Sequence, residues 1–161
     1  MSSDEDFSGR ARSVSRRIMR GFSPDSLRAA RRAAGISQVE AARVARVGAD
    51  TIRRWEQGES SPQVDLLAKV TGALGVEIAD VVHIPEGERY PGDWRVLLGL
   101  TQPQLGAKAG VATQIVSSVE RGVISLSGNV AVKLAAALEI PESELRASYE
   151  RARNRPAGAP A

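Results

Sequence analysis

Two stretches of the chain, residues 35–58 (GISQVEAARVARVGADTIRRWEQG) and residues 99–122 (GLTQPQLGAKAGVATQIVSSVERG), are copies of one pattern. They align without insertion at a separation of 64 residues, and six of the 24 aligned positions are identical. The same separation relates Arg31 to Arg95. Because an internal repeat decides the organisation of a chain, we predict two copies of one folding unit within the 161 residues.

Each copy is predicted to fold into five short helices, because cap and turn residues punctuate its apolar positions. Ser37 and Glu40 fit a capping box at the start of the second helix. In the first copy the helices are expected to begin near Ser23-Pro24, Ser37, Ala49, Pro62 and Ile78. In the second copy they are expected over about 93–98, 102–109, 113–121, 127–138 and 142–151.

The fold expected from this pattern is all-α, with two tandem five-helix domains at residues 23–84 and 93–151. A short linker over 85–92 joins them, and its extended reach of about 26–29 Å suits domains that approach neighbouring major grooves about 34 Å apart. Residues 1–22 are expected to form an acidic and then arginine-rich arm or an extra helix. Residues 152–161 are predicted to be a disordered tail.

The composition excludes several classes of function. The chain has no Cys and one His, which excludes disulfides, thiolate metal sites and His-rich metal centres. No apolar run approaches the ~20 residues that span a bilayer, and the N-terminus lacks a signal-peptide pattern. No catalytic constellation recurs in the two copies. We therefore expect a cytoplasmic protein that is not an enzyme, with no metal, cofactor or membrane contact.

The charges alternate along the chain although the net charge is only +3. Between Arg10 and Arg54 twelve arginines face three acids, whereas Glu56–Asp93 holds eight acids and two bases. The stretch from Trp94 to Lys133 is again basic, with four bases and one acid. Two basic regions separated by an acidic one are expected where two faces meet phosphate. Ordinary solvated helix faces are the alternative interpretation.

The repeated stretches resemble the lambda-repressor/Cro (Xre-like) helix-turn-helix family. The resemblance rests on the Gly-Ile-Ser-Gln and Gly-Leu-Thr-Gln openings, the small residues Ala42 and Gly106, and the Glu-X-Gly closes that begin at Glu56 and Glu120. It covers about 25–83 and 91–150 and implies a transcriptional regulator, a repressor, that binds double-stranded DNA. Phage or mobile-element control is the setting that it suggests.

The resemblance also implies one ion pair per domain. The family places an arginine of its first helix against the glutamate of its third, and Arg31–Glu56 and Arg95–Glu120 share a spacing of 25 residues. Removing one partner of such a pair is expected to cost ~3–5 kcal/mol if the pair is dry.

The third helix of each copy is implied to read bases in the major groove, since the family docks this helix there. The base-facing positions are Gly48, Ala49, Asp50, Arg53 and Arg54 in the first copy, and Ala112, Thr113, Gln114, Ser117 and Ser118 in the second. Phosphate contacts are assigned to Gln38, Arg46, Gln57, Gln102, Lys108 and Arg121. Asp50 is expected to brace Arg54 for a guanine, and Gln114 to bind adenine. Because the two sets differ, the predicted site is asymmetric.

Three alternatives stay open on the sequence alone. The family usually has Gly at the turn that Arg46 occupies, so either a phosphate contact offsets a strain of about 1 kcal/mol or the turn is distorted. The arm with Arg10, Arg12, Arg16 and Arg17 either packs as a helix through an apolar stripe or enters the minor groove. The second domain either reads DNA or mediates homodimerisation or protein binding, as in an antitoxin or adaptor.

Overall fold

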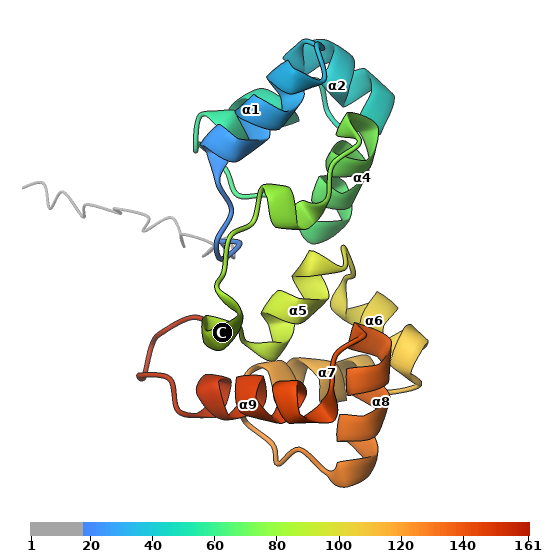
Figure 1. Ribbon diagram of the computed structural model, residues 1–161, viewed down its shortest axis with the longest axis vertical. Coiled ribbons are helices and arrows are strands. Elements are labelled where there is room, and N and C mark those ends of the chain that lie inside the picture. The colour runs from blue at the N-terminus through green and yellow to red at the C-terminus, as the bar shows by residue number, and fades with distance from the viewer. Residues whose placement is uncertain (1–17) are drawn as a thin grey trace, which may run out of the picture.

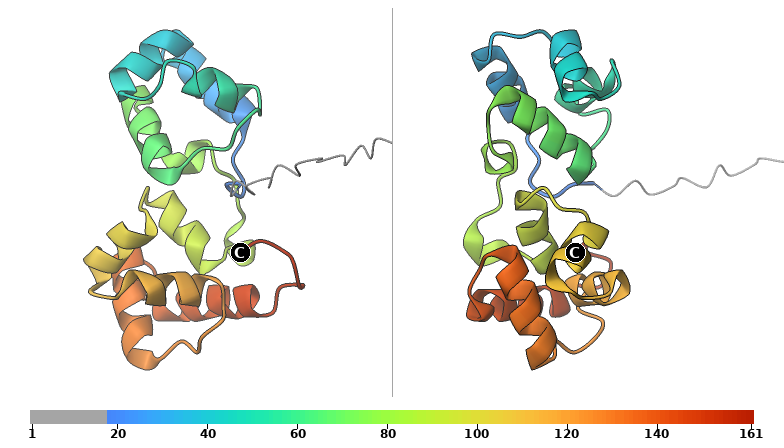
Figure 2. Two further views of the ribbon diagram at one scale, coloured as in Figure 1. Left: turned by 180° about the vertical axis from the view of Figure 1, so that it is seen from behind. Right: turned by 90° about the vertical axis from the view of Figure 1, so that its right-hand side faces the viewer.

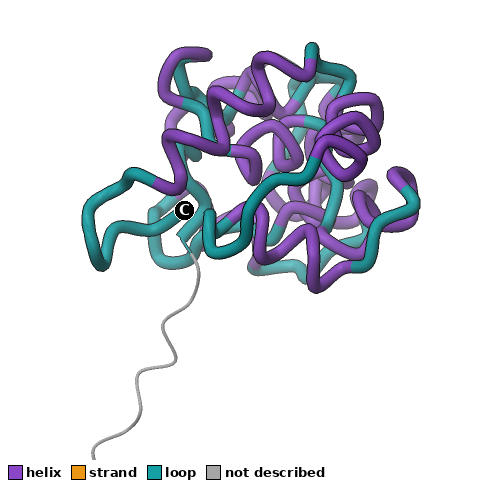
Figure 3. The backbone as a smooth tube through the Cα atoms, turned by 90° about the horizontal axis from the view of Figure 1, so that it is seen from below, coloured by secondary structure: helices purple, strands orange, loops and turns teal. Residues whose placement is uncertain are grey.

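The computed structural model describes residues 18–161, and these form helices joined by turns and loops without a named strand. Figure 1 shows two helical lobes stacked along the long axis, with α1–α4 in one and α5–α9 in the other. The tube in Figure 3 likewise alternates helix and loop through the described part of the chain. The all-α prediction is confirmed.

The first domain contains four α-helices and one short 3-10 turn. They are α1 (Pro24–Ala33), α2 (Gln38–Ala45), α3 (Thr51–Glu56), α4 (Val64–Leu74) and η1 (Ile78–Asp80). The Ser23 hydroxyl accepts a hydrogen bond from the Ser26 N–H and starts α1 as predicted, as expected for an N-cap. Two expectations need correction: α3 begins at Thr51, two residues after Ala49, and the fifth helix is a single 3-10 turn.

The second domain has five full α-helices. They are α5 (Pro91–Leu97), α6 (Gln102–Ala109), α7 (Thr113–Glu120), α8 (Gly128–Leu138) and α9 (Glu142–Arg153). Leu126 replaces Pro62 of the first domain, yet α8 starts 64 residues after α4, because the Ser127 hydroxyl accepts from the Val130 N–H (3.3 Å). The last helix runs to Arg153, so the first two residues of the predicted tail are helical.

At the start of the second helix of each domain, only the second domain has a complete capping box. Ser37 accepts from the Glu40 N–H (3.1 Å), but the Glu40 carboxylate binds Arg43 and does not return to the Ser37 N–H. Thr101 and Gln104 instead form the complete reciprocal pair at 3.2 and 2.9 Å. The predicted capping box at Ser37 and Glu40 is therefore confirmed for Ser37 and wrong for the Glu40 side chain.

Each domain has its own apolar core. In the first, Leu27, Ile52 and Leu67 are completely buried, and Trp55 lies with them. In the second, Leu145 is completely buried, and Leu105, Val116 and Leu134 form the cluster around it. Small residues bring the helices close together, since Ala41, Ala42 and Ala45 of α2 are all buried where this helix packs against α4. The Ala-rich composition is therefore used for close helix packing.

The two domains pack directly against each other. Val96 and Leu97 of α5 contact the core of the first domain. The segment from Pro85 to Tyr90 is folded, with a 3-10 turn (η2) at Glu86–Glu88. Arg151 of α9 donates to the carbonyl oxygens of Arg89 (2.9 Å) and Glu86 (3.3 Å). The predicted linker is thus shorter than 85–92, because α5 begins at Pro91, and it is not an extended tether.

The described end of the N-terminal segment, residues 18–22, contains a turn at Arg20 and Gly21 and no helix. The backbone of Phe22 pairs with Val82 in an isolated antiparallel bridge, and the His83 N–H donates to the Gly21 carbonyl oxygen (2.8 Å). Met19 donates its N–H to the Ser61 hydroxyl (2.7 Å). The extra-helix interpretation does not hold for residues 18–22, whereas Arg10, Arg12, Arg16 and Arg17 lie outside the described residues.

Candidate nucleic-acid interface

The turn between α2 and α3 keeps the left-handed backbone without a glycine. Arg46 adopts φ 58° and ψ 45°, and Gly110 of the second domain adopts φ 68° and ψ 37°. The Val47 N–H then donates to the Ala42 carbonyl (3.0 Å), and Val111 donates to Gly106 in the same way (2.9 Å). The turn at Arg46 is therefore undistorted, and the side chain of Arg46 is exposed.

The two turns differ in how closely α2 and α6 approach them. A Cβ added to Gly106 would lie 2.6 Å from the Val111 carbonyl oxygen, which no ordinary side chain tolerates. The first domain has Ala42 at this position, with only 1% of its surface exposed. The second turn is thus tighter than the first, and its small residue is glycine for steric reasons.

One face of α3 is buried and the other carries the predicted base-reading residues. Ile52 and Trp55 anchor the helix in the core. Gly48, Ala49 and Asp50 are exposed before and at its start. The side chains of Arg53 and Arg54 are 37% and 42% exposed. The predicted reading face of the first domain is therefore accessible and carries two arginines.

Arg53 is held by three neighbours in the free protein. Its Nη2 donates to Asp50 Oδ2 (2.7 Å) and its Nε binds the other carboxylate oxygen. Its Nη1 donates to Gln57 (2.8 Å) and to Glu59 (3.3 Å). The hydrogen bond that Arg53 donates to Asp50 lowers the pKa of Asp50 and raises the pKa of Arg53. The expectation that Asp50 braces Arg54 is wrong, because in this short helix the carboxylate meets the i+3 guanidinium.

Arg54 is the less constrained of the two cations on α3. Its Nε lies 3.9 Å from Glu59, a distance at which the interaction is electrostatic without being a hydrogen bond. Glu59 faces both Arg53 and Arg54 from just beyond the helix and was not among the predicted residues. Its position immediately after Gly58 was the available signal, since a glycine that ends a helix turns the chain back on itself.

The corresponding face of α7 is uncharged. Ala112, Thr113 and Gln114 are exposed, while Ser117 and Ser118 are half-buried. Val116 and Val119 fix the opposite face in the core. The helix thus presents hydroxyl and amide groups, which suit hydrogen bonds to base edges but add nothing to counterion release.

The predicted phosphate-contacting residues lie around these two helices. Gln102 at the start of α6 donates to Glu120 (2.8 Å), and Gln38, its counterpart in the first domain, helps to lower the pKa of Glu56. Arg121 is exposed after α7 and donates to the Ser117 carbonyl (3.4 Å). Lys108 is exposed, with its Nζ 4.0 Å from Glu139. Their contacts with phosphate stay predictions.

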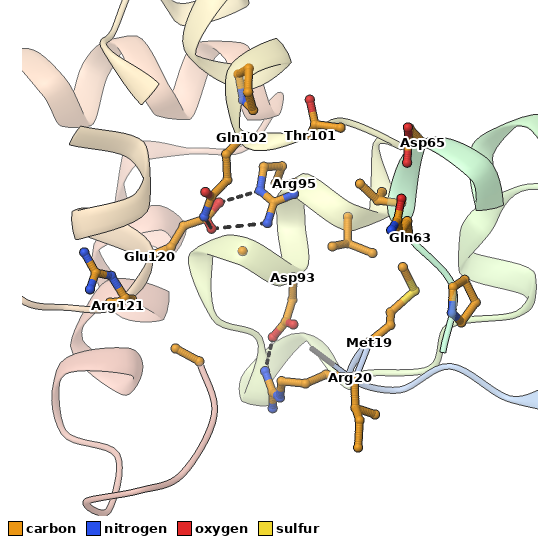
Figure 4. Close-up of a pocket in the computed structure, with 17 residues that line it drawn as sticks. Met19, Arg20, Gln63, Asp65, Asp93, Arg95, Thr101, Gln102, Glu120 and Arg121 are labelled. Atoms are coloured by element: carbon orange, nitrogen blue, oxygen red, sulfur yellow. Dashed lines mark hydrogen bonds and ion pairs between the residues drawn. The ribbon is translucent and has the colours of Figure 1, made fainter. Parts of the chain in front are cut away.

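Both interhelical ion pairs are present as predicted. Arg31 donates from Nε and Nη2 to the two oxygens of Glu56 at 2.8 and 2.9 Å. Arg95 binds Glu120 in the same two-pronged way at 2.5 and 3.2 Å, as Figure 4 shows. Both pairs tie the first helix of a domain to the end of its third helix, so they position the reading helix.

Burial and pairing act in opposite directions on Glu56. Its side chain is completely buried, and this burial is the largest single effect and works to raise the pKa. The hydrogen bond and charge of Arg31, with Gln38 and Arg28, together outweigh it, so the pKa is lowered. The hydrogen bond that Arg31 donates to Glu56 in turn raises the pKa of Arg31. The Glu56 carboxylate therefore stays ionised inside the domain, as a structural charge.

A family model described as helix-turn-helix matches the chain twice, at residues 27–81 and 93–145. The comparison with curated proteins and the comparison with solved structures give no match. Among the described residues, none of the helices is long and apolar enough to cross a membrane.

Proposed function

The chain belongs to the lambda-repressor/Cro-like (Xre) helix-turn-helix family of DNA-binding transcription regulators, and from that premise we propose that it is a repressor that reads an asymmetric, two-part site. The observation that supports the proposal is the arrangement of α3 and α7. Both helices lie on the same side of the molecule in the two views of Figure 2, teal in the first domain and tan in the second. One duplex running along that side meets two unlike helices.

The first half-site is assigned to α3. Arg54, the cation with fewer partners, is proposed to bind guanine through two parallel hydrogen bonds, which contribute ~1–3 kcal/mol of discrimination. Arg53 is held by Asp50 and Gln57 and is suited to a phosphate contact at the edge of the groove. Arg46 is exposed in the preceding turn and is proposed to bind the same backbone strand.

The second half-site is assigned to α7. Gln114 is proposed to pair with adenine and Thr113 to contact a thymine methyl group. Gln102 and Arg121 flank the helix and would hold the backbone, with Lys108 nearby. Because this face has few cations, we expect most of the affinity to come from the first domain. Binding at a promoter suffices to exclude polymerase, which is why repression is the proposed outcome.

Selection from randomised duplexes, followed by footprinting, tests the two-part site. We expect a non-palindromic motif with a G-containing half and an A/T-containing half. A motif confined to one short half-site would contradict reading by both domains.

Matched variants separate the contributions of the two helices. Arg54→Ala is expected to weaken binding by ~1–3 kcal/mol and to relax selection in the first half-site. Gln114→Ala with Ser118→Ala is expected to relax the second half-site and leave the salt dependence unchanged. Arg146→Ala, which removes an exposed arginine paired with Glu142 on α9, is the control for loss of charge and is expected to bind normally.

The uncharged face of α7 favours a second candidate, in which the second domain binds a protein or a second copy of the chain while the first domain alone binds DNA. Under this alternative, the Gln114→Ala and Ser118→Ala variant keeps its full DNA affinity. Sedimentation of the free protein would then show a dimer, or the second domain would retain a partner when DNA is absent.

A further inference from the structure

A cleft of about 440 Å³ lies between the two domains. The start of α4 and residues Met19 and Arg20 line it from the first domain, and the starts of α5 and α6 with the end of α7 line it from the second. Figure 4 shows the Asp93–Arg20 and Glu120–Arg95 pairs side by side in this cleft. Its volume falls in the range of small-molecule sites, ~300–1,000 Å³.

The second domain lacks one arginine that the first domain places beside its buried glutamate. In the first domain, Arg28 donates to the Glu56 carbonyl oxygen (2.8 Å), and its Nε lies 3.5 Å from Glu56 Oε1. The residue 64 positions later is Gly92. A Cβ added there would lie 3.3 Å from Glu120 Oε2, so this carboxylate borders the space that an arginine side chain would occupy.

Two buried carboxylates therefore border that space. Glu120, 7% exposed, binds Arg95 and Gln102 but has no counterpart of Arg28. Asp93, 6% exposed, uses its Oδ2 for both the Tyr90 N–H and Arg20. Burial raises the pKa of Asp93, and the charge of Glu120 adds to the rise. The two negative charges thus act on each other, and a cation near Gly92 would stabilise both.

We propose that this cleft binds a small aliphatic molecule with a guanidinium head, which takes the place that Arg28 fills in the first domain. The planar head can donate to Glu120 and to Asp93 in the paired geometry that carboxylates favour. Met19, Val64 and Val96 line the cleft beside this point and offer an apolar surface for the aliphatic stem. The inference goes beyond the proposed function, because it requires no DNA.

Calorimetric titration of the full chain with agmatine, in the absence of DNA, tests the site. We expect saturable binding of one agmatine per chain. 4-Aminobutylurea keeps the amine and the stem of agmatine and replaces its guanidinium head by a neutral urea. It is expected to bind at least about tenfold more weakly, because hydrogen bonds to charged groups are the stronger ones. Absence of agmatine binding, or equal binding of 4-aminobutylurea, would overturn the proposal.

Gly92→Arg restores the residue of the first domain and is expected to abolish agmatine binding. Gly72→Ala is the matched control, because a Cβ at Gly72 meets nothing within 4 Å, and it should bind like the parent chain. Far-UV circular dichroism checks that both variants are folded. Undiminished agmatine binding by Gly92→Arg would place the ligand elsewhere and refute the site.

Two further variants predict changes of opposite sign. Asp93→Asn keeps an acceptor for the Tyr90 N–H but loses the charge, so agmatine binding should weaken by about tenfold. Arg20→Ala removes the cation that pairs with Asp93, so binding should tighten.

Arg16→Ala with Arg17→Ala tests whether the chain itself supplies the guanidinium. If agmatine binds the Arg16→Ala, Arg17→Ala double variant but not the parent chain, an arginine of the chain itself occupies the site. That result would overturn the proposal of a free small molecule.

Discussion

The two domains share a scaffold and differ in what that scaffold presents. The core positions, the interhelical ion pair and the left-handed turn recur at a separation of 64 residues. The reading face changes from two arginines on α3 to hydroxyl and amide groups on α7, and the neighbour of the buried glutamate changes from Arg28 to Gly92. The features that build the scaffold thus recur, while the residues on the predicted reading faces and beside the buried glutamate differ.

The ion pairs give the largest expected difference between the domains. Arg31→Ala and Arg95→Ala each leave a buried carboxylate and are expected to cost ~3–5 kcal/mol of unfolding free energy. The cost of Arg95→Ala should be the larger, because Arg28 stays beside Glu56 whereas Gly92 offers no second cation to Glu120. Urea unfolding measures both values.

Each domain contains one tryptophan, Trp55 in the first and Trp94 in the second. Trp55→Phe and Trp94→Phe backgrounds therefore assign each fluorescence transition to one domain. Equal losses in the two domains would show that Arg28 contributes nothing to holding Glu56.

The close approach of α6 to its turn gives the next largest effect. Gly106→Ala is expected to destabilise the second domain by ~1–3 kcal/mol, because the added methyl group meets a backbone oxygen that cannot move aside. The reverse change in the first domain, Ala42→Gly, should cost only ~0.5–1 kcal/mol through backbone entropy. If the two changes cost the same, the second turn is not the tighter one. Thermal unfolding in the single-tryptophan backgrounds measures both.

The left-handed residue of the turn gives a smaller effect with the opposite sign. Arg46→Gly is expected to stabilise the first domain by about 1 kcal/mol, since glycine adopts this conformation without strain. If Arg46 also binds phosphate, the variant loses DNA affinity and its salt dependence falls by about one ion. If the variant is stabilised and the salt dependence of DNA binding is unchanged, Arg46 does not bind phosphate.

The pH dependence of stability gives the smallest expected difference between the two domains. The lowered pKa of Glu56 means that its pairing contributes stability above its ordinary pKa of 4.5, and this stability is lost as the pH falls through the lower folded value. The raised pKa of Asp93 means that its charge costs stability at neutral pH, and the cost disappears as the pH falls toward its ordinary 3.8. The first domain should therefore lose stability before the second when the pH is lowered. Stability measured against pH with each tryptophan checks the order, and Asp93→Asn should remove the gain in the second domain.

The repeat made most of the fold predictable because caps, cores and ion pairs depend on neighbours close in sequence or on a fixed spacing. Ser23, Ser37 and the Arg31–Glu56 pair are all where the pattern places them. The short fifth element of the first domain was not predictable, since Ile78 and Val81 are buried equally well by one 3-10 turn.

The reading face was less predictable than the scaffold. The choice of Asp50 between Arg53 and Arg54 depends on side-chain directions in a helix of only six residues, and spacing alone allows both. The Arg20–Asp93 and Arg151–Arg89 contacts join residues more than sixty positions apart. Neither contact leaves a periodic signal in the sequence, so the packing of the two domains could not be inferred from it.

The anchoring of the connector by Arg151 has a consequence for the operator. Because the segment between Pro85 and Tyr90 is fastened to the last helix and α5 rests on the opposite core, the span separating the two reading surfaces is a fixed property of the polypeptide. If both surfaces read bases, as proposed, such a molecule is expected to respond to the helical phase of the DNA as well as to base identity. Inserting about five base pairs between the half-sites, half a helical turn, would carry one half to the far side of the duplex, and no slack in the chain would compensate.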